Sequence, residues 1–249
     1  MKTIIDLVIV NFNTKKILLQ CLQSIEAYTP LPHRVIVVDN GSQDGSLEML
    51  SQMASNHLIM IANTKNEGYA KACNQGILAG TSPYILLLNS DVLVTAHWLE
   101  PLLHCMDSDP RIAVVGPKMI DHHGQITGAG IVGTNAHHEP RGLFERNEIG
   151  KYDQQEDCIS VCGAAYLIRR DLLAQLGLFD ENYFFYFEET DYSFNARSQG
   201  YRVVYCPEST IYHLMGQSCK DHGKLRALFE DSEHYFRKKW AHLLIESEG

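Results

Sequence analysis

Near its N-terminus the chain reads Ile4-Ile5-Asp6-Leu7-Val8-Ile9-Val10-Asn11-Phe12-Asn13, an apolar run that ends in polar residues. Further short apolar runs follow at residues 34–38, 58–61 and 84–88. Amphipathic stretches of helix length come after the four runs, at residues 14–27, 46–55, 69–79 and 96–106. This alternation is typical of repeated βα units. The sequence therefore predicts an α/β fold with a parallel sheet.

Polar clusters follow all four runs, at residues 11–13, 39–42, 63–68 and 89–91. The carboxyl ends of parallel strands open into one crevice, so these clusters should converge on a single ligand site. Asn, Asp and Gly also favour turns, which explains any one cluster without a ligand. Four clusters in succession favour the ligand site.

The composition is that of a compact soluble protein. Of 249 residues, 45% are hydrophobic and 20% charged, which excludes disorder, collagen and coiled coil. The 21 Lys and Arg against 30 Asp and Glu give a net charge of −9, a poor match for a phosphate backbone. We therefore expect no nucleic-acid partner.

Cysteine usage and hydropathy predict a cytoplasmic location. The seven cysteines include no C-x2-C pair, as expected for reduced thiols. The N-terminus lacks the longer apolar stretch of a signal peptide, and no segment reaches the roughly 18 apolar residues of a membrane span. Any membrane contact should be peripheral, at the inner face.

The second half of the chain, residues 116–249, is less regular than residues 1–115, but no linker separates them, so we expect one domain. Glu188, Glu189 and Asp191 stand where a helix is expected to begin, and that helix should end at Gly200. A strand at 202–206 stopped by Pro207, a short run at 210–212 and a last helix at 225–244 should follow.

In order and approximate spacing, these motifs resemble family 2 glycosyltransferases, in their rhamnosyltransferase-like branch. The matching motifs are Val8-Ile9-Val10-Asn11-Phe12-Asn13, Val37-Val38-Asp39-Asn40-Gly41-Ser42, Asp44-Gly45-Ser46, Asn66-Glu67-Gly68-Tyr69-Ala70, Asn89-Ser90-Asp91, and Glu188-Glu189-Thr190-Asp191 leading to His213. The match covers roughly residues 4–240. Each motif alone is weak, and the ordered set is strong.

The resemblance implies a GT-A fold, with a mostly parallel central sheet flanked by helices and a smaller sheet on the acceptor side. Residues 1–115 would bind the nucleotide, and residues 116–249, with the C-terminal helix, the acceptor. The implied reaction moves a sugar, with inversion, from a UDP- or dTDP-sugar to a saccharide or lipid-linked saccharide.

The resemblance also assigns nucleotide-binding residues, which are Asn11, Asn13, Asp39, Asn66, Lys71, Asn89 and Ser90. Asp39 would accept from the imide N–H of uracil or thymine, or else form an Asx turn. Lys71 would lie near the base or phosphate, or else on a solvated helix face. Asn11 and Asn13 would act largely through their backbone.

A divalent cation, Mn²⁺ or Mg²⁺, would stabilise the charge that develops on a nucleotide diphosphate leaving group. Such ions prefer oxygen ligands, and Asp91 is the best candidate. Many relatives carry Asp-x-Asp here, but this chain has Asn89, which would touch ribose or shape the turn. His213 with Gly216 and Ser218 resembles a His-x-x-Gly-x-Ser motif whose imidazole completes the metal site.

The acceptor hydroxyl needs a general base about 3 Å away. The resemblance places this base on Glu189, with Asp191 as the alternative and Glu188 in the same cluster. The helix dipole also favours acids in a first turn without catalysis. Gly163 and Ala164 would admit the donor sugar, or else serve strand packing. The His122-His123 and His137-His138 pairs fit no standard zinc spacing and are predicted to be loop residues.

Other classes of protein remain to be weighed against this one. A sugar-phosphate nucleotidyltransferase or an NAD-dependent oxidoreductase normally has a Gly-rich loop after the first strand, and Asn11-Phe12-Asn13-Thr14 is not one. A catalytically inactive module that binds carbohydrate or a partner stays open, because Asn89 and Glu189 depart from the family pattern.

Overall fold

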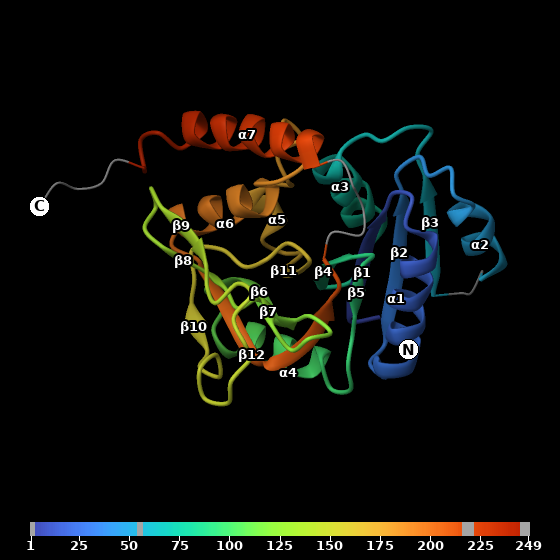
Figure 1. The fold of residues 1–249 in the computed structure, drawn as a ribbon, viewed down its shortest axis with the longest axis horizontal. Helices are drawn as coiled ribbons and strands as arrows, with labels where there is room; N and C mark the ends of the chain where they lie inside the picture. The colour runs from blue at the N-terminus through green and yellow to red at the C-terminus, as the bar shows by residue number, and fades with distance from the viewer. Residues whose placement is uncertain (1–2, 54–56, 216–221, 245–249) are drawn as a thin grey trace, which may run out of the picture.

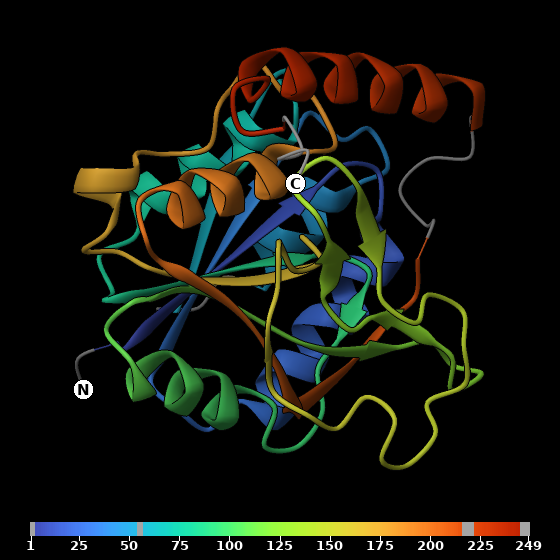
Figure 2. The same ribbon diagram turned by 90° about the vertical axis from the view of Figure 1, so that its left-hand side faces the viewer.

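The computed structural model describes residues 3–53, 57–215 and 222–244. It shows a 10-stranded sheet between two layers of helices, with one further helix over the outside (Figures 1 and 2). The strands of this sheet are β1 (Ile5–Asn11), β2 (His33–Asp39), β3 (Leu58–Ala62), β4 (Tyr84–Asn89), β5 (Val92–Leu93), β6 (Ile112–Ile120), β7 (Ile126–Gly128), β10 (Glu156–Asp157), β11 (Ala165–Arg169) and β12 (Arg202–His213). A separate two-stranded sheet pairs β8 (Ile131–Gly133) with β9 (His138–Pro140).

The strand order is β10-β12-β6-β11-β4-β1-β2-β3. The predicted parallel unit is the part that runs from β4 through β1 and β2 to β3. On its other side β11 is antiparallel to both β4 and β6, whereas β6 and β12 run parallel. This arrangement brings the second half of the chain against the carboxyl end of β4, where the polar residue Asn89 lies.

The helices are α1 (Lys15–Tyr28), α2 (Ser46–Gln52), α3 (Tyr69–Ala79), α4 (Leu99–Ser108), α5 (Leu173–Leu176), α6 (Glu188–Ser198) and α7 (His222–Lys239). The expectation for 69–79 matches α3, and α4 starts three residues later than expected. Gly200 follows the end of α6 with φ +85°, as a residue just past a helix should. The last helix was placed too late, because α7 begins at His222.

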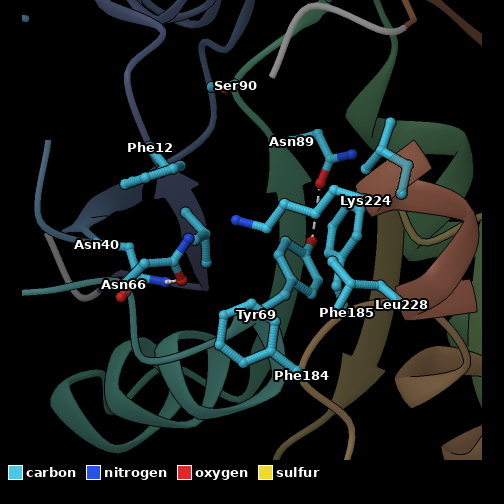
Figure 3. A pocket seen from close by; sticks show the side chains of 12 residues that line it. Phe12, Asn40, Asn66, Tyr69, Asn89, Ser90, Phe184, Phe185, Lys224 and Leu228 are labelled. Carbon is cyan, nitrogen blue, oxygen red and sulfur yellow. Dashed lines mark hydrogen bonds between the residues drawn. The ribbon is translucent and has the colours of Figure 1, made fainter. Parts of the chain in front are cut away.

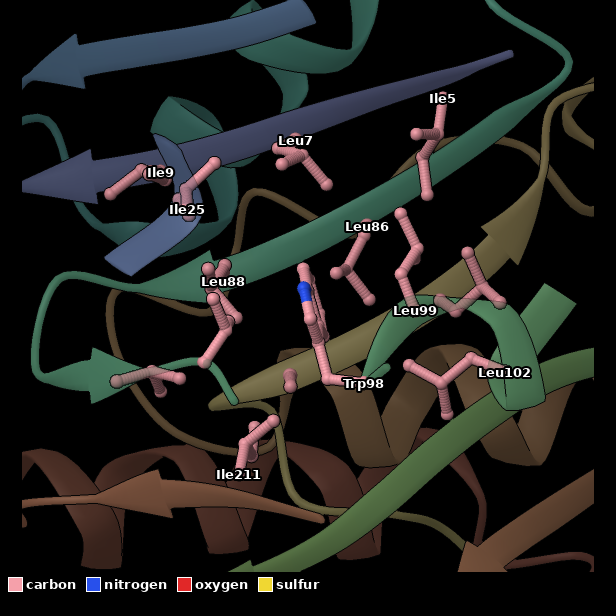
Figure 4. Close-up of a cluster of buried hydrophobic side chains, with 14 of the residues drawn as sticks. Ile5, Leu7, Ile9, Ile25, Leu86, Leu88, Trp98, Leu99, Leu102 and Ile211 are labelled. Carbon is pink, nitrogen blue, oxygen red and sulfur yellow. The ribbon is translucent and has the colours of Figure 1, made fainter. Parts of the chain in front are cut away.

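Alternating side chains of β1 build the two cores that hold the helices. Ile5, Leu7 and Ile9 point into one core, with Trp98 and helices α1 and α4 (Figure 4). Val8 points into the other core, with residues of α3 and α6. This is the period-2 pattern of a strand buried on both faces. The sheet edge that carries the polar clusters is thereby fixed between rigid layers.

The prediction that Pro207 stops a strand was wrong. β12 continues from Arg202 to His213 and stays paired with β6, with a register irregularity between Cys206 and Thr210. A bulge lets a strand contain a proline, because the residue without an N–H falls where the ladder is interrupted. The continuation matters because it delivers His213 opposite Val92 of β5.

Candidate functional site

A pocket opens at the carboxyl ends of β1, β2 and β4, where the sequence predicts a ligand site. We call it the strand-end pocket; it is lined by Val10, Phe12, Asn40, Asn66, Tyr69, Asn89, Ser90, Phe184, Phe185, Lys224, Leu225 and Leu228 (Figure 3). Three of the expected nucleotide-binding residues, Asn66, Asn89 and Ser90, are among them. The last three residues come from α7, so the C-terminal helix closes one side of the pocket.

Asp39 does not line the strand-end pocket, although the sequence assigned it to the base. Its carboxylate is fully buried, and both oxygens accept hydrogen bonds from the neighbouring loop. Asn11 Nδ2 donates to Oδ2 at 2.7 Å, and the Ser42 N–H donates to Oδ1 at 2.8 Å. Asp39 and the Asn11 side chain thus tie the β1 and β2 loops together, which is the role of a turn-forming aspartate.

Asn40, the next residue, faces the pocket in its place. Its Nδ2 donates to Asn66 Oδ1 at 2.9 Å and to the Gly68 carbonyl at 3.1 Å. Its Oδ1 accepts from Asn63 Nδ2 at 3.0 Å and from the Glu67 N–H at 3.1 Å. Asn40 belongs to the motif Val37-Val38-Asp39-Asn40-Gly41-Ser42, but nothing in the sequence indicates that its side chain, rather than that of Asp39, would face the pocket.

Asn13 and Lys71 also lie outside the pocket lining. Asn13 has φ +56° and its Oδ1 accepts from the Gln43 N–H at 2.8 Å, so it joins two loops. Lys71 is partly exposed and its Nζ lies 2.8 Å from Glu67 Oε2, one helical turn earlier. The Lys71 side chain thus lies on the helix surface in an i,i+4 ion pair, and its nucleotide-binding role stays a prediction.

Tyr69 connects the pocket to the second half of the chain. Its hydroxyl donates to Asn89 Oδ1 at 2.9 Å, and the Gly163 carbonyl lies 3.5 Å away (Figure 3). Its N–H donates to the Phe184 carbonyl at 2.7 Å. Asn89 and Tyr69 therefore form part of a pocket wall to which three segments of the chain contribute. Tyr69 is a site residue for which sequence analysis predicted no role.

Asp91 and His213 meet as expected for a shared cation. Nε2 of His213 lies 3.5 Å from Oδ1 of Asp91, and both residues are buried. Burial would lower the pKa of His213, but interactions with Asp91 and Cys162 outweigh burial and raise this pKa to about 10. Buried Nδ1 of His213 has no hydrogen-bond partner. Gly216 and Ser218 lie outside the described residues.

The acidic cluster begins α6, with three different environments. Glu188 is 3% exposed, its Oε2 has no partner, and burial together with the charge of Glu189 raises its pKa well above the usual value. Glu189 is partly exposed; burial raises its pKa too, and backbone N–H groups including that of Gly163 oppose the shift. Glu189 is thus the acid whose carboxylate can meet a ligand.

Asp191, the alternative base, is held by three donors. Lys239 Nζ donates to its Oδ2 at 2.8 Å, while Trp240 Nε1 at 2.7 Å and the Tyr183 hydroxyl at 3.0 Å donate to its Oδ1. Burial raises the pKa of Asp191 and these donors lower it. A carboxylate committed to three internal donors lacks a free oxygen for an acceptor proton, so the geometry favours Glu189.

Gly163 lies between the strand-end pocket and Glu189. A Cβ at Gly163 would come 3.1 Å from Cδ of Glu189, closer than ordinary van der Waals contact. On its other side the Gly163 carbonyl faces the Tyr69 hydroxyl, and the Ala164 carbonyl accepts from the Asn89 N–H at 2.9 Å. Gly163, predicted beside a donor sugar, therefore lies next to both Tyr69 of the pocket and the acid, and Ala164, predicted with it, lies next to Asn89.

A second hollow, which we call the α7 groove, lies on the Glu189 side. It is lined by Ile131, Asn135, Ala136, His137, His138, Pro140, Tyr186, Phe187, Glu189, Thr190, Phe229, Glu233, Phe236, Arg237 and Leu244. His137 lies 3.1 Å from Glu139, whereas His138 is not a loop residue as expected but begins β9 and packs on Phe194. No group of three or more His, Cys, Asp or Glu side chains able to hold a metal occurs among the described residues.

Comparison with known proteins identifies the family. The model of "Glycosyl transferase family 2" matches residues 6–177, more than half of the chain. The chain belongs to this family. Among curated relatives, this family 2 glycosyltransferase is 25% identical over 241 residues to the N-acetylglucosaminyl-diphospho-decaprenol L-rhamnosyltransferase of Mycobacterium tuberculosis, covering 88% of this chain and 78% of the relative. It is 26% identical over 217 residues to the O-antigen biosynthesis protein RfbC of Myxococcus xanthus, covering 83% of this chain and 17% of the relative.

Solved structures confirm the GT-A fold of this family 2 glycosyltransferase. GalNAc-T7 with UDP, GalNAc and Mn²⁺ superposes with a TM-score of 0.70 at 17% identity, over 88% of this chain and 44% of that chain. The mannosyltransferase PcManGT from Pyrobaculum calidifontis, in complex with GDP-Man and Mn²⁺, superposes with a TM-score of 0.70 at 16% identity, over 97% of this chain and 65% of that chain. At such identities the likeness concerns the fold alone. Among its described helices, none has the length and apolarity that crossing a membrane requires.

Proposed function

We propose that this family 2 glycosyltransferase transfers a sugar, with inversion, from a UDP- or dTDP-sugar to a saccharide or lipid-linked saccharide acceptor. The observation that carries the proposal is the position of Gly163, with the strand-end pocket on one side and the Glu189 carboxylate on the other. A donor sugar beside Gly163 would present its anomeric carbon between a leaving group in the pocket and an acid that can accept a proton.

The nucleotide would occupy the strand-end pocket. Phe12, Tyr69 and Phe184 supply aromatic surface for a base, and the Asn66 side chain supplies an amide N–H group at the pocket wall, whereas the Asn40 amide is already fully hydrogen-bonded and shapes that wall. A pocket at the carboxyl ends of parallel strands is where this class of sheet binds nucleotides. The two structural neighbours are complexes with UDP and with GDP-Man, which supports a nucleotide-sugar donor as a class.

Asp91 and His213 fit a divalent cation. Two ligand atoms about 2.1 Å from one ion are at most about 4.2 Å apart, and the Nε2 and Oδ1 atoms lie 3.5 Å apart. The buried Nδ1 of His213 has no hydrogen-bond partner, so the hydrogen bonding of this imidazole is incomplete within the protein. When bound, the cation supplies positive charge that stabilises a departing diphosphate.

Glu189 would act as the general base. In the reaction the acceptor oxygen loses its proton to Glu189 and bonds to the anomeric carbon, while the bond from that carbon to the diphosphate oxygen breaks and the nucleotide diphosphate leaves. A base should have a pKa near the working pH. Burial moves the pKa of Glu189 upward in that direction. Glu188, buried behind it, would stay protonated and leave one charge at the site.

The α7 groove would hold the acceptor, because Glu189 is part of its wall. Tyr186, Phe187 and Phe229 offer ring faces for the apolar faces of pyranose rings. The mycobacterial relative is named for a saccharide linked through diphosphate to decaprenol, which supports a lipid-linked acceptor. A protein that acts on such an acceptor would work in the cytoplasm, at the inner face of the membrane.

A donor screen tests this function. Purified protein with Mn²⁺ is incubated with UDP-, dTDP- and GDP-sugars and a saccharide acceptor, and release of nucleotide diphosphate is measured. We expect release with a UDP- or dTDP-sugar, and loss of release with EDTA. Binding of a nucleotide diphosphate without turnover of any donor would instead indicate an inactive binding module. Absence of binding to all nucleotide diphosphates would overturn the proposal.

A further inference from the structure

Lys239, near the end of α7, bonds to both ends of one segment of the chain. Its Nζ lies 2.7 Å from Asp180 Oδ2 and 2.8 Å from Asp191 Oδ2. The Lys239 side chain is 31% exposed, and the Asp180 and Asp191 side chains are 19% and 6% exposed. Removing one partner from a partly buried ion pair is costly, because it leaves the other charge buried and uncompensated. We call residues 180–191 the aromatic segment.

The interior of the aromatic segment contributes to both cavities. Phe184 and Phe185 line the strand-end pocket, whereas Tyr186, Phe187 and Glu189 line the α7 groove. The segment therefore runs from one cavity to the other, and the proposed base lies at its far end. Any shift of the segment would move the walls of both cavities and the Glu189 carboxylate together.

The middle of the segment has an unfavourable backbone conformation. Tyr186 has φ +73° and Phe187 has φ +70°, in the left-handed region that residues with a Cβ rarely adopt. Such residues persist only where the surrounding structure holds them, and they gather at functional sites. The contacts that hold this turn include those at its two ends, and Lys239 makes an ion pair with each.

We propose that Lys239 is a positioning residue: by joining Asp180 to Asp191 it holds the aromatic segment, and thereby Glu189, in the geometry for transfer. The inference rests on the proposed function for its kinetic consequence, although its structural consequence can be measured without turnover. Trp240 assists, because its Nε1 donates to the same carboxylate that Lys239 pairs with. Lys239 lines neither the strand-end pocket nor the α7 groove, so its proposed effect passes through these two acids.

The test compares Lys239→Met and Lys239→Arg with Lys238→Met, a change at an exposed lysine one residue earlier in the same helix. Hydrogen exchange of the apoprotein is followed in peptides that cover residues 182–190. We expect exchange there to become at least about tenfold faster in Lys239→Met, with sheet peptides such as 84–89 unchanged. Lys239→Arg should restore most of the protection, since a guanidinium can pair with both carboxylates.

The kinetic experiment measures kcat for each protein molecule that can bind nucleotide. The fraction of such molecules is taken from the stoichiometry of UDP or dTDP binding in the presence of Mn²⁺. Lys239→Met should lose about tenfold or more in this kcat, with partial rescue by Arg, because small displacements of reacting groups are costly. A variant that merely unfolds in part would keep its kcat per site.

The two proposals fail in different ways. If the wild-type protein had no transfer activity, the proposed function would be wrong. The hydrogen-exchange experiment would then decide the role of Lys239. Unchanged exchange across residues 182–190 in Lys239→Met would overturn the positioning role, as would an active wild type whose kcat per site is unaffected by Lys239→Met.

Discussion

Gly163 and Glu189 are in direct contact: a Cβ added to Gly163 would stand 3.1 Å from Cδ and 3.2 Å from Oε1 of Glu189. The contact explains why residue 163 is small in physical terms, because a side chain there would push the carboxylate away. It also places the acid beside the segment that separates it from the strand-end pocket.

Gly163→Ala should therefore lower kcat by about tenfold, since displacement of a reacting group by a fraction of an ångström is already costly. Affinity for the nucleotide diphosphate, measured by titration calorimetry, should change little, because Gly163 is not part of the strand-end pocket lining. The double variant Gly163→Ala/Glu189→Gln is the control, because it should be no slower than Glu189→Gln alone. Full additivity of the two losses would show that Gly163 acts independently of Glu189.

Asp91→Asn should weaken the metal-dependent part of donor binding. The variant keeps the shape of the side chain but removes the negative charge that faces His213. We expect affinity for UDP or dTDP with Mn²⁺ to fall by about tenfold or more, and affinity without metal to stay the same. Calorimetry with and without Mn²⁺ measures both affinities. If Mn²⁺ increased the affinity of Asp91→Asn as much as that of wild type, the cation would be bound elsewhere.

Glu188→Gln should stabilise the protein increasingly as pH rises. Burial and the charge of Glu189 raise the pKa of Glu188 well above its unfolded value. A carboxyl with a raised pKa in the folded state lowers the free energy of unfolding as the pH rises above its pKa in the unfolded state, near 4.3. This loss of stability continues until the pH reaches the pKa of the folded state. The difference in unfolding free energy, variant minus wild type, should therefore grow above about pH 5, by at most about 1.4 kcal/mol per pH unit.

Urea denaturation at several pH values measures this difference. Asp191→Asn gives the opposite comparison, because that carboxylate is held by Lys239, Trp240 and Tyr183 and its loss should destabilise the protein. A difference for Glu188→Gln that is flat with pH would show that Glu188 ionises normally in the folded protein.

Phe229→Ala should raise the KM for the acceptor with little effect on the donor. Phe229 is 44% exposed, lines the α7 groove, and its ring lies 5.2 Å from that of Phe187. Loss of one aromatic contact corresponds to about 0.5–1.5 kcal/mol, or roughly a 2- to 13-fold higher KM. Phe144→Ala, at a 57% exposed phenylalanine outside the groove lining, is the matched control. Equal effects of both variants would contradict the acceptor assignment.

The sequence was sufficient to predict the parallel part of the sheet and the convergence of polar residues at its carboxyl edge. Four apolar runs with polar ends carry this information, because parallel strands must end on the same side. The meeting of Asp91 with His213 followed from the family resemblance. The path that brings them together, a strand that continues past Pro207, was not predictable, because a bulge in β12 depends on its pairing with β6.

Side-chain directions and long-range contacts were beyond the sequence. Whether Asp39 or Asn40 faces the pocket depends on the turn that Ser42 and Asn11 stabilise. Lys239 and Asp191 come from different helices, and neither helix shows in its periodicity that the two residues will pair. The same limit hid the contribution of α7 to both cavities, since apolar spacing tells which face is covered but not by what.

The most direct test of Glu189 as the general base is the kcat of Glu189→Gln, compared with wild type at saturating donor and acceptor. Glutamine keeps the size of the side chain but cannot accept the acceptor proton, so we predict a loss of about 10²- to 10⁴-fold with donor affinity retained. Glu189→Asp, which restores a carboxylate on a shorter arm, should recover part of that loss. A Glu189→Gln variant with wild-type kcat would contradict the assignment of Glu189 as the general base.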